Sequence, residues 1–163
     1  MRYLVFFILV ILFGCQTKQC DEIYINGFTH FEKDNVIIYR TASENILKTI
    51  KPDEEAGWMV NVINMQGDYF QINIEDLNLN KVWIQKGEVY ANTRNYDDSN
   101  IELKEKPNEF STIVFYLHKQ QTLKILNGCK DWAFVEGKDK RGNLVRGWVQ
   151  SNMLCENPYT TCP

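Results

Sequence analysis

Hydrophobic residues follow two different patterns along the chain. Residues 3–13, YLVFFILVILF, are apolar without interruption, and this run is too short to span a bilayer, which takes about 20 apolar residues. From residue 22 onward, apolar and polar residues alternate in short segments such as VNVIN at 60–64 and LKILN at 123–127. Alternation with a period of two is typical of half-buried strands, and no stretch shows a convincing helical period. The pattern predicts an all-β protein behind an apolar leader.

The alternating part of the chain repeats itself. EIYIN at 22–26 is echoed by EVYAN at 88–92, and the segments that follow them match in the same order. The further matched pairs are VIIYRTASEN (36–45) with NIELKEKPNE (100–109), VNVIN with LKILN, GDYFQINI (67–74) with KDWAFVEG (130–137), and VWIQKGEV (82–89) with GWVQSNML (147–154). Self-similarity sustained at a period of about 65 residues indicates two copies of one structural unit.

The two units are expected at residues 22–87 and 88–156, followed by a C-terminal tail at 157–163. A single unit of this size is close to the lower limit for independent folding. Short strands at this spacing favour a small barrel or sandwich. EVYAN follows WIQKG at 83–87 without a linker. The end of the first unit is therefore the start of the second, which predicts one stiff tandem body.

The matched segments resemble the second half of bacterial SH3 domains. In that family an aromatic residue follows a Gly-Asp or similar turn, and a hairpin leads to Gly-Trp-Val and a polar 3₁₀-like exit, as in KDWAFVEG…RGWVQSNML. ELKEKPNE at 102–109 resembles the early proline-containing turn of the family. The first copy departs from the pattern, with Val82 in place of Gly147 and no counterpart of Pro107. The resemblance covers nearly all of residues 22–156 and implies two consecutive SH3-like β-barrels that bind cell-wall peptides or peptidoglycan.

The apolar leader ends at a cysteine. Arg2 supplies a positive charge before the apolar run, which closes with LFGC at 12–15; this arrangement resembles the signal peptide and lipobox of bacterial lipoproteins. The resemblance implies a signal peptide over residues 1–14 and a lipid-modified Cys15. Acyl chains on that residue, at about 0.8 kcal/mol per buried CH₂, would hold the protein at a membrane. An ordinary secretory signal, cut elsewhere, is the alternative.

Under the lipoprotein interpretation, residues 15–21 form a lipidated tether. The protein is then expected in the bacterial cell envelope, on the periplasmic side of a membrane or at the cell surface. The chain carries 18 Lys and Arg against 21 Asp and Glu. Nucleic-acid binding usually shows as a cluster of basic residues, so we expect no nucleic-acid partner.

Export to the envelope would permit disulfides. Four cysteines besides Cys15 allow three complete pairings, which the sequence leaves open; they are Cys20, Cys129, Cys155 and Cys162. The Asn-Pro step in CENPYTTC favours a turn that pairs Cys155 with Cys162. The chain has no CxxC pair and only 2 histidines, so the sequence predicts neither a metal site nor a cofactor.

Aromatic residues are the candidate ligand contacts. SH3-like barrels can hold extended ligands in an aromatic groove, and the candidates for such a groove are Tyr39, Tyr96, Tyr116 and Tyr159. Trp58 has no counterpart in the second copy and follows a glycine, which predicts an exposed loop position. The aromatic residues at matched strand positions are expected in the core or at strand edges instead; these are Tyr69, Trp83, Trp132 and Trp148.

Three functions were weighed. The sequence favours a lipid-anchored binding module for cell-wall peptide, glycan or an envelope protein, and an inhibitor or immunity-type partner of an envelope protein is the alternative. A cell-wall hydrolase is a remote third, because a nucleophile must lie beside a base and an orienting group. Nothing in the spacing joins Cys129 to His118 or His30, so we expect no enzymatic activity.

Overall fold

A computed structural model describes Cys20 and residues 22–29, 35–43, 45–51, 57–96 and 99–157. The described part is all-β, as predicted, with two single-turn 3₁₀ helices, η1 (Glu75–Leu77) and η2 (Ser151–Met153). The strands are β1 (Ile25–Thr29), β2 (Val36–Tyr39), β3 (Ile46–Ile50), β4 (Met59–Gln66), β5 (Tyr69–Ile74), β6 (Leu79–Gln85), β7 (Val89–Thr93), β8 (Ile101–Lys104), β9 (Ile113–Leu117), β10 (Thr122–Cys129), β11 (Trp132–Lys138), β12 (Leu144–Gln150) and β13 (Leu154–Cys155). Within these ranges no helix has the length and hydrophobicity to cross a membrane.

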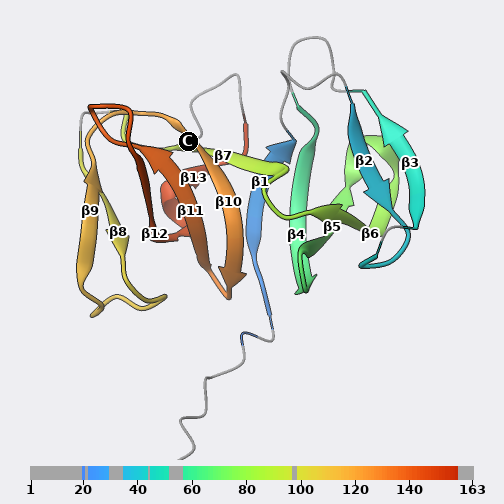
Figure 1. The fold of residues 1–163 in the computed structure, drawn as a ribbon, viewed down its shortest axis with the longest axis horizontal. Helices are drawn as coiled ribbons and strands as arrows, with labels where there is room; N and C mark the ends of the chain where they lie inside the picture. The colour runs from blue at the N-terminus through green and yellow to red at the C-terminus, as the bar shows by residue number, and fades with distance from the viewer. Residues whose placement is uncertain are drawn as a thin grey trace, which may run out of the picture.

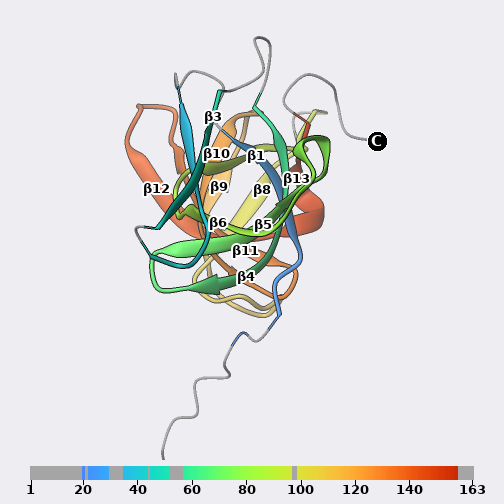
Figure 2. The ribbon, with the colours of Figure 1, turned by 90° about the vertical axis from the view of Figure 1, so that its right-hand side faces the viewer.

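The strands form one continuous hydrogen-bonded path. Their order is β3-β2-β6-β5-β4-β1-β7-β10-β11-β12-β8-β9, and β13 pairs with β7. Figure 1 shows the two halves of this path side by side, with β1 and β4 in the middle of the molecule. Seen from the end, the halves lie one behind the other (Figure 2). A single antiparallel sheet therefore joins both halves of the sequence.

The predicted repeat is present in the strand pairing. The pairs β1–β4, β4–β5, β5–β6, β6–β2 and β2–β3 recur in the second half as β7–β10, β10–β11, β11–β12, β12–β8 and β8–β9. The registers also correspond: β4–β5 and β10–β11 are each irregular at the step that leads to Asn64 and Asn127. The side chain of each asparagine accepts a hydrogen bond from the N–H of the next residue, at 2.8 and 3.0 Å. This local bond satisfies a donor that the bulge removes from the ladder.

Two buried threonines confirm the correspondence at the other end of these strands. The N–H of Thr29 donates to the carbonyl of Trp58 at 2.9 Å, and the hydroxyl of Thr29 accepts the N–H of Trp58 at 2.9 Å. Thr93 makes the same two bonds with Gln121, at 3.0 and 2.9 Å. Trp58, which the sequence left unmatched, is therefore the counterpart of Gln121. Ile25, and not Ile23, is the counterpart of Val89, so the predicted EIYIN–EVYAN alignment is wrong by two residues.

The strand β7 belongs to both units. As the first strand of the second unit, β7 pairs with β10, just as β1 pairs with β4 in the first unit. As the last strand of the first unit, β7 pairs with β1, just as β13 pairs with β7 in the second. The predicted boundary after residue 87 thus falls immediately before a shared strand. One hydrophobic cluster runs through both units, from Ile38 and Phe70 to Leu103 and Val149. The expectation of one tandem body is supported by this shared strand and shared core.

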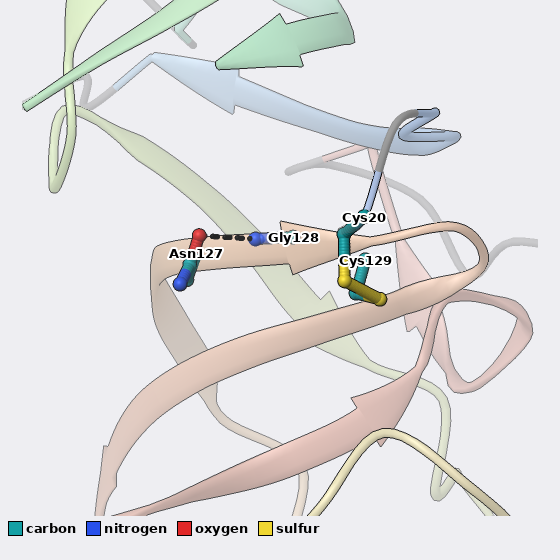
Figure 3. The surroundings of a disulfide bond; sticks show 4 residues. All are labelled: Cys20, Asn127, Gly128 and Cys129. Carbon is teal, nitrogen blue, oxygen red and sulfur yellow. Dashed lines mark hydrogen bonds between the residues drawn. A yellow bond between two sulfur atoms is a disulfide. The ribbon is translucent and has the colours of Figure 1, made fainter. Parts of the chain in front are cut away.

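The N-terminal segment is fixed to the second unit. Cys20 forms a disulfide with Cys129 at the end of β10, across 109 residues of sequence, and Figure 3 shows the two side chains meeting beside the Asn127 bulge. Next to it, the N–H of Tyr24 donates to the carbonyl of Lys130 at 2.8 Å, and the N–H of Lys130 donates to the carbonyl of Glu22 at 2.7 Å. The first unit is therefore joined covalently to the second.

Candidate functional site

A surface groove occurs at the same place in both units. The second-unit groove has a volume of about 350 Å³ and is lined by Asn100, Ile101, Glu102, Lys104, Glu109, Trp132, Val149, Gln150 and Met153. The first-unit groove is smaller, about 110 Å³, and is lined by Asn35, Ile37, Tyr39, Gln85 and Glu88. The strand pairing makes these five residues the counterparts of Asn100, Glu102, Lys104, Gln150 and Met153. Each unit thus carries its own version of one groove.

The second-unit groove combines an apolar floor with polar walls. Trp132 is almost completely buried in the floor, while Met153 of η2 is 43% exposed. The ammonium group of Lys104 donates to the carbonyl of Glu109 at 2.7 Å and lies 3.1 Å from the carboxylate of Glu102. These contacts hold the turn that follows β8 against the groove. Such a site can bury an apolar side chain and orient the ligand through its polar walls.

The first-unit groove has a different chemical character. Tyr39 replaces Lys104, and its ring meets Tyr69 edge-to-face at a centroid distance of 5.2 Å. Ile37 takes the place of Glu102, and Glu88 takes the place of Met153. The two grooves therefore share a position in the fold but not a preference for the same chemical group.

A larger groove, which we call the lysine groove, lies only beside strands of the second unit. It has a volume of about 470 Å³ and is lined by Tyr90, Phe115, Tyr116, Leu117, His118, Lys119, Gln120, Gln121, Thr122, Lys124, Glu136, Gly137, Lys138, Asp139, Lys140 and Leu144. Tyr116 is 42% exposed and Leu144 is 61% exposed. Tyr116 stacks on His118 at a centroid distance of 6.4 Å. The lysine groove and the second-unit groove share no lining residue.

The two carboxylates of the lysine groove are already engaged. Glu136 is paired with the guanidinium of Arg146, with N···O distances of 2.6 and 2.8 Å. Asp139 accepts hydrogen bonds from the backbone of Arg141 and from Asn143, at 2.7 to 2.8 Å. The bonds from Asn143 hold the pKa of Asp139 below its usual range. The charge of Glu136 is therefore balanced by Arg146, whereas Asp139 remains ionised and offsets one positive charge of the groove.

The base of the lysine groove is a neutral tyrosine below a cation. The ammonium group of Lys124 lies 6.0 Å from the centre of the Tyr90 ring, which is within the range of a cation–π contact. Burial, assisted by the carboxylates of Glu88 and Glu136, raises the pKa of Tyr90 to about 12. Tyr90 is therefore uncharged near neutral pH and does not reduce the positive charge of the lysines.

The first unit does not reproduce the lysine groove. Asn26, Thr49 and Asn61 stand at the positions of Tyr90, Tyr116 and Lys124. Trp58, at the position of Gln121, packs against the core, and its indole N–H donates to the carbonyl of Lys51 at 2.7 Å. Trp58 is thus half-buried against the core, although the sequence predicted an exposed loop position.

The sequence-predicted contacts fall in different places. Tyr39 lines the first-unit groove, although it is only 9% exposed, and Tyr116 lines the lysine groove. Tyr96 is 36% exposed and lines none of these grooves. Trp58 is half-buried. Tyr159 lies outside the described residues, so its role stays a prediction.

The cysteines can be placed in part. Cys129, which was weighed as a nucleophile, is held in the disulfide with Cys20. Cys155 is also disulfide-bonded, but its predicted partner Cys162 lies outside the described residues, as does Cys15. His118 Nδ1 lies 2.5 Å from the side-chain oxygen of Asn100. Among the described residues no three potential ligands gather as a metal site.

Sequence reasoning missed the residues that give each groove its character. Met153 lines the second-unit groove, and Lys119, Lys138 and Lys140 line the lysine groove. The available signal was the contrast between copies, since Met153 aligns with Glu88 and Lys138 aligns with Glu75. Positions that differ in charge between two copies of one unit mark surfaces that serve only one of them.

Comparisons with known proteins give a distant structural likeness. No family model matches the sequence, and no curated protein matches it. Among solved structures, the chain is similar to NlpC2 from Trichomonas vaginalis, with 13% identity and a TM-score of 0.33 over 80% of this chain and 47% of the other. It is also similar to NlpC1 from Trichomonas vaginalis, with 14% identity and a TM-score of 0.32 over 94% of this chain and 51% of the other. The chain spans about half the length of these structures, and likeness at this level carries no argument about function.

Proposed function

We propose that this protein is a lipid-anchored binding module of the bacterial cell envelope, in which each unit is an SH3-like barrel with a groove for cell-wall peptide or peptidoglycan. The observation that carries the proposal is the recurrence of one groove at matched positions of both units. A groove that accompanies the repeat is built by the fold itself, and a tandem pair raises the effective concentration of the second contact once the first has formed.

The strand pairing supports the barrel interpretation. In each unit one hairpin joins the rest of the sheet through a single residue pair. The β2–β3 hairpin joins β6 through Tyr39–Trp83, and the β8–β9 hairpin joins β12 through Lys104–Trp148. Such a short contact fits a hairpin that bends away from the main sheet and folds over its face. Folding over the face is how a small sheet encloses a core.

The disulfide between Cys20 and Cys129 supports a location outside the cytoplasm, where such bonds persist. Replacing Cys15 with serine is expected to move the protein from the membrane fraction to the soluble fraction, because the acyl chains would have no acceptor. Cell fractionation with immunoblotting measures this, and Cys155→Ser serves as a matched control. Continued sedimentation of the Cys15→Ser protein with membranes would contradict the lipid anchor.

Binding to the cell wall is tested by sedimentation of the detergent-purified protein with isolated peptidoglycan. The protein is expected to pellet, and Met153→Glu is expected to weaken binding about tenfold by placing a charge where an apolar ligand group sits. Glutamate is the native residue at the matched position, Glu88, so the fold tolerates it there. Met59→Glu, also exposed but outside both repeat grooves, is the control. No pelleting above an unrelated protein would refute wall binding.

A further inference from the structure

The lysine groove has an excess of positive charge that the protein itself does not neutralise. Lys119, Lys124, Lys138 and Lys140 line it together with only two acids. Glu136 is paired with Arg146, so Asp139 is left to offset a single lysine charge. None of the four lysines forms an ion pair with a residue in the described part of the chain. The chain as a whole has a formal net charge of −3. A local basic site on an acidic protein selects an anionic partner.

The groove is also apolar, which excludes a bare anion as its best occupant. The exposed side chains of Tyr116 and Leu144 lie among the lysines. A ligand that covers this groove must therefore present apolar and acidic groups on the same face. In an extended peptide the side chains at positions i, i+2 and i+4 share one face, so these positions must carry the two kinds of group in turn.

One wall of the groove is the last strand of the sheet. β9 ends the strand order, and its described neighbour in the ladder is β8 alone. Its sequence, IVFYL, contains β-branched and aromatic residues and no charge, and Val114 and Tyr116 are both exposed. Edge strands of this composition accept a further strand unless charges or prolines within them prevent it. The strand β9 itself contains no charged residue, and the nearby charges are the lysines of the groove beside it.

We propose that β9 and the lysine groove form a docking site for an extended acidic segment of a partner protein, which adds to the sheet as a strand beside β9. Its backbone hydrogen-bonds to the open edge of β9, its apolar side chains cover Tyr116 and Leu144, and its carboxylates pair with the lysines. The site is distinct from the two repeat grooves, because it shares no lining residue with either of them.

The probe for this site is a short fluorescent peptide in which every second residue is valine or glutamate in turn, with serine between them, so that both kinds of side chain face the groove. Its anisotropy is expected to rise with the full chain in detergent, and the affinity is expected to fall with added salt. Lys138→Glu with Lys140→Glu should weaken binding by roughly tenfold or more, because two attractions become repulsions. Lys48→Glu with Lys51→Glu, two exposed lysines of the first unit, is the matched control. Amide hydrogen exchange should show added protection of β9 in the complex.

Four outcomes would overturn the proposal. These are failure of the acidic peptide to bind, equal binding of the same peptide with lysine in place of each glutamate, equal loss in the Lys48 and Lys51 control, and binding without added protection of β9. A sulfated polysaccharide that displaces the peptide and leaves the β9 amides unprotected would identify a glycan site instead. Loss of peptidoglycan binding in Met153→Glu with unchanged peptide affinity would separate this site from the repeat grooves.

Discussion

Removal of the Cys20–Cys129 disulfide is expected to lower the free energy of unfolding by about 2–5 kcal/mol. The bond spans 109 residues, and cross-links that close long loops remove the most conformational freedom from the unfolded chain. The folded state is weakened as well, because the disulfide holds the N-terminal segment against Lys130. For a chain of this length the change corresponds to a decrease in melting temperature of roughly 5–15 °C.

The measurement is thermal unfolding of the double variant Cys20→Ser with Cys129→Ser, followed by circular dichroism without reductant. The double variant is preferred over either single one, because a remaining thiol could pair with another cysteine. Reductant is unsuitable for this test because Cys155 is also disulfide-bonded, and Cys155→Ser therefore serves as the control for that second bond. A double variant that melts within about 2 °C of the parent protein would show that β1 and β7 hold the units together without the disulfide.

The strands and the repeat could be predicted from the sequence because both follow from local patterns. Alternation places Ile72 and Val135 in the core, and both are fully buried. Of the four matched aromatic residues expected in the core or at strand edges, Trp83 and Trp132 are buried, and Trp148 and Tyr69 are half-buried. The chain has no linker at residue 88, and β7, which begins at Val89, lies in the same sheet as β1. What the sequence could not show is that β7 completes the first unit while it begins the second.

The grooves were less accessible because they depend on contacts between distant segments. Lys119 lies in the loop before β10 and Lys138 is the last residue of β11, and the β10–β11 pairing brings them to one surface. Trp58 and Gln121 have unrelated side chains, so only the backbone bonds to Thr29 and Thr93 identify them as counterparts. The pairing of Cys20 with Cys129 is likewise set by the tertiary position of the N-terminal segment, which no local pattern encodes.

Substituting Gly27 with alanine is expected to destabilise the protein by about 1–3 kcal/mol, the usual cost of forcing extra volume into a packed interior. Gly27 lies on β1 where β7 passes closest. A Cβ atom there would lie 2.5 Å from the carbonyl oxygen of Tyr90 and 2.9 Å from Cγ1 of Val89. The first contact is with backbone, which cannot rotate away as a side chain can. The two strands must therefore move apart, and they are the hydrogen-bonded link between the units.

The matched residue of the second unit, Ala91, carries the Cβ atom that Gly27 lacks and is fully buried. The strand conformation therefore accepts alanine, and the expected cost at Gly27 arises from the junction with β7 alone. Thermal unfolding of Gly27→Ala measures the effect, with Asn26→Ala as the control, since Asn26 is exposed on the same strand. If Gly27→Ala has the same melting temperature as Asn26→Ala, then β1 and β7 can separate at little cost in free energy. The units would then be joined by the disulfide more than by the shared sheet.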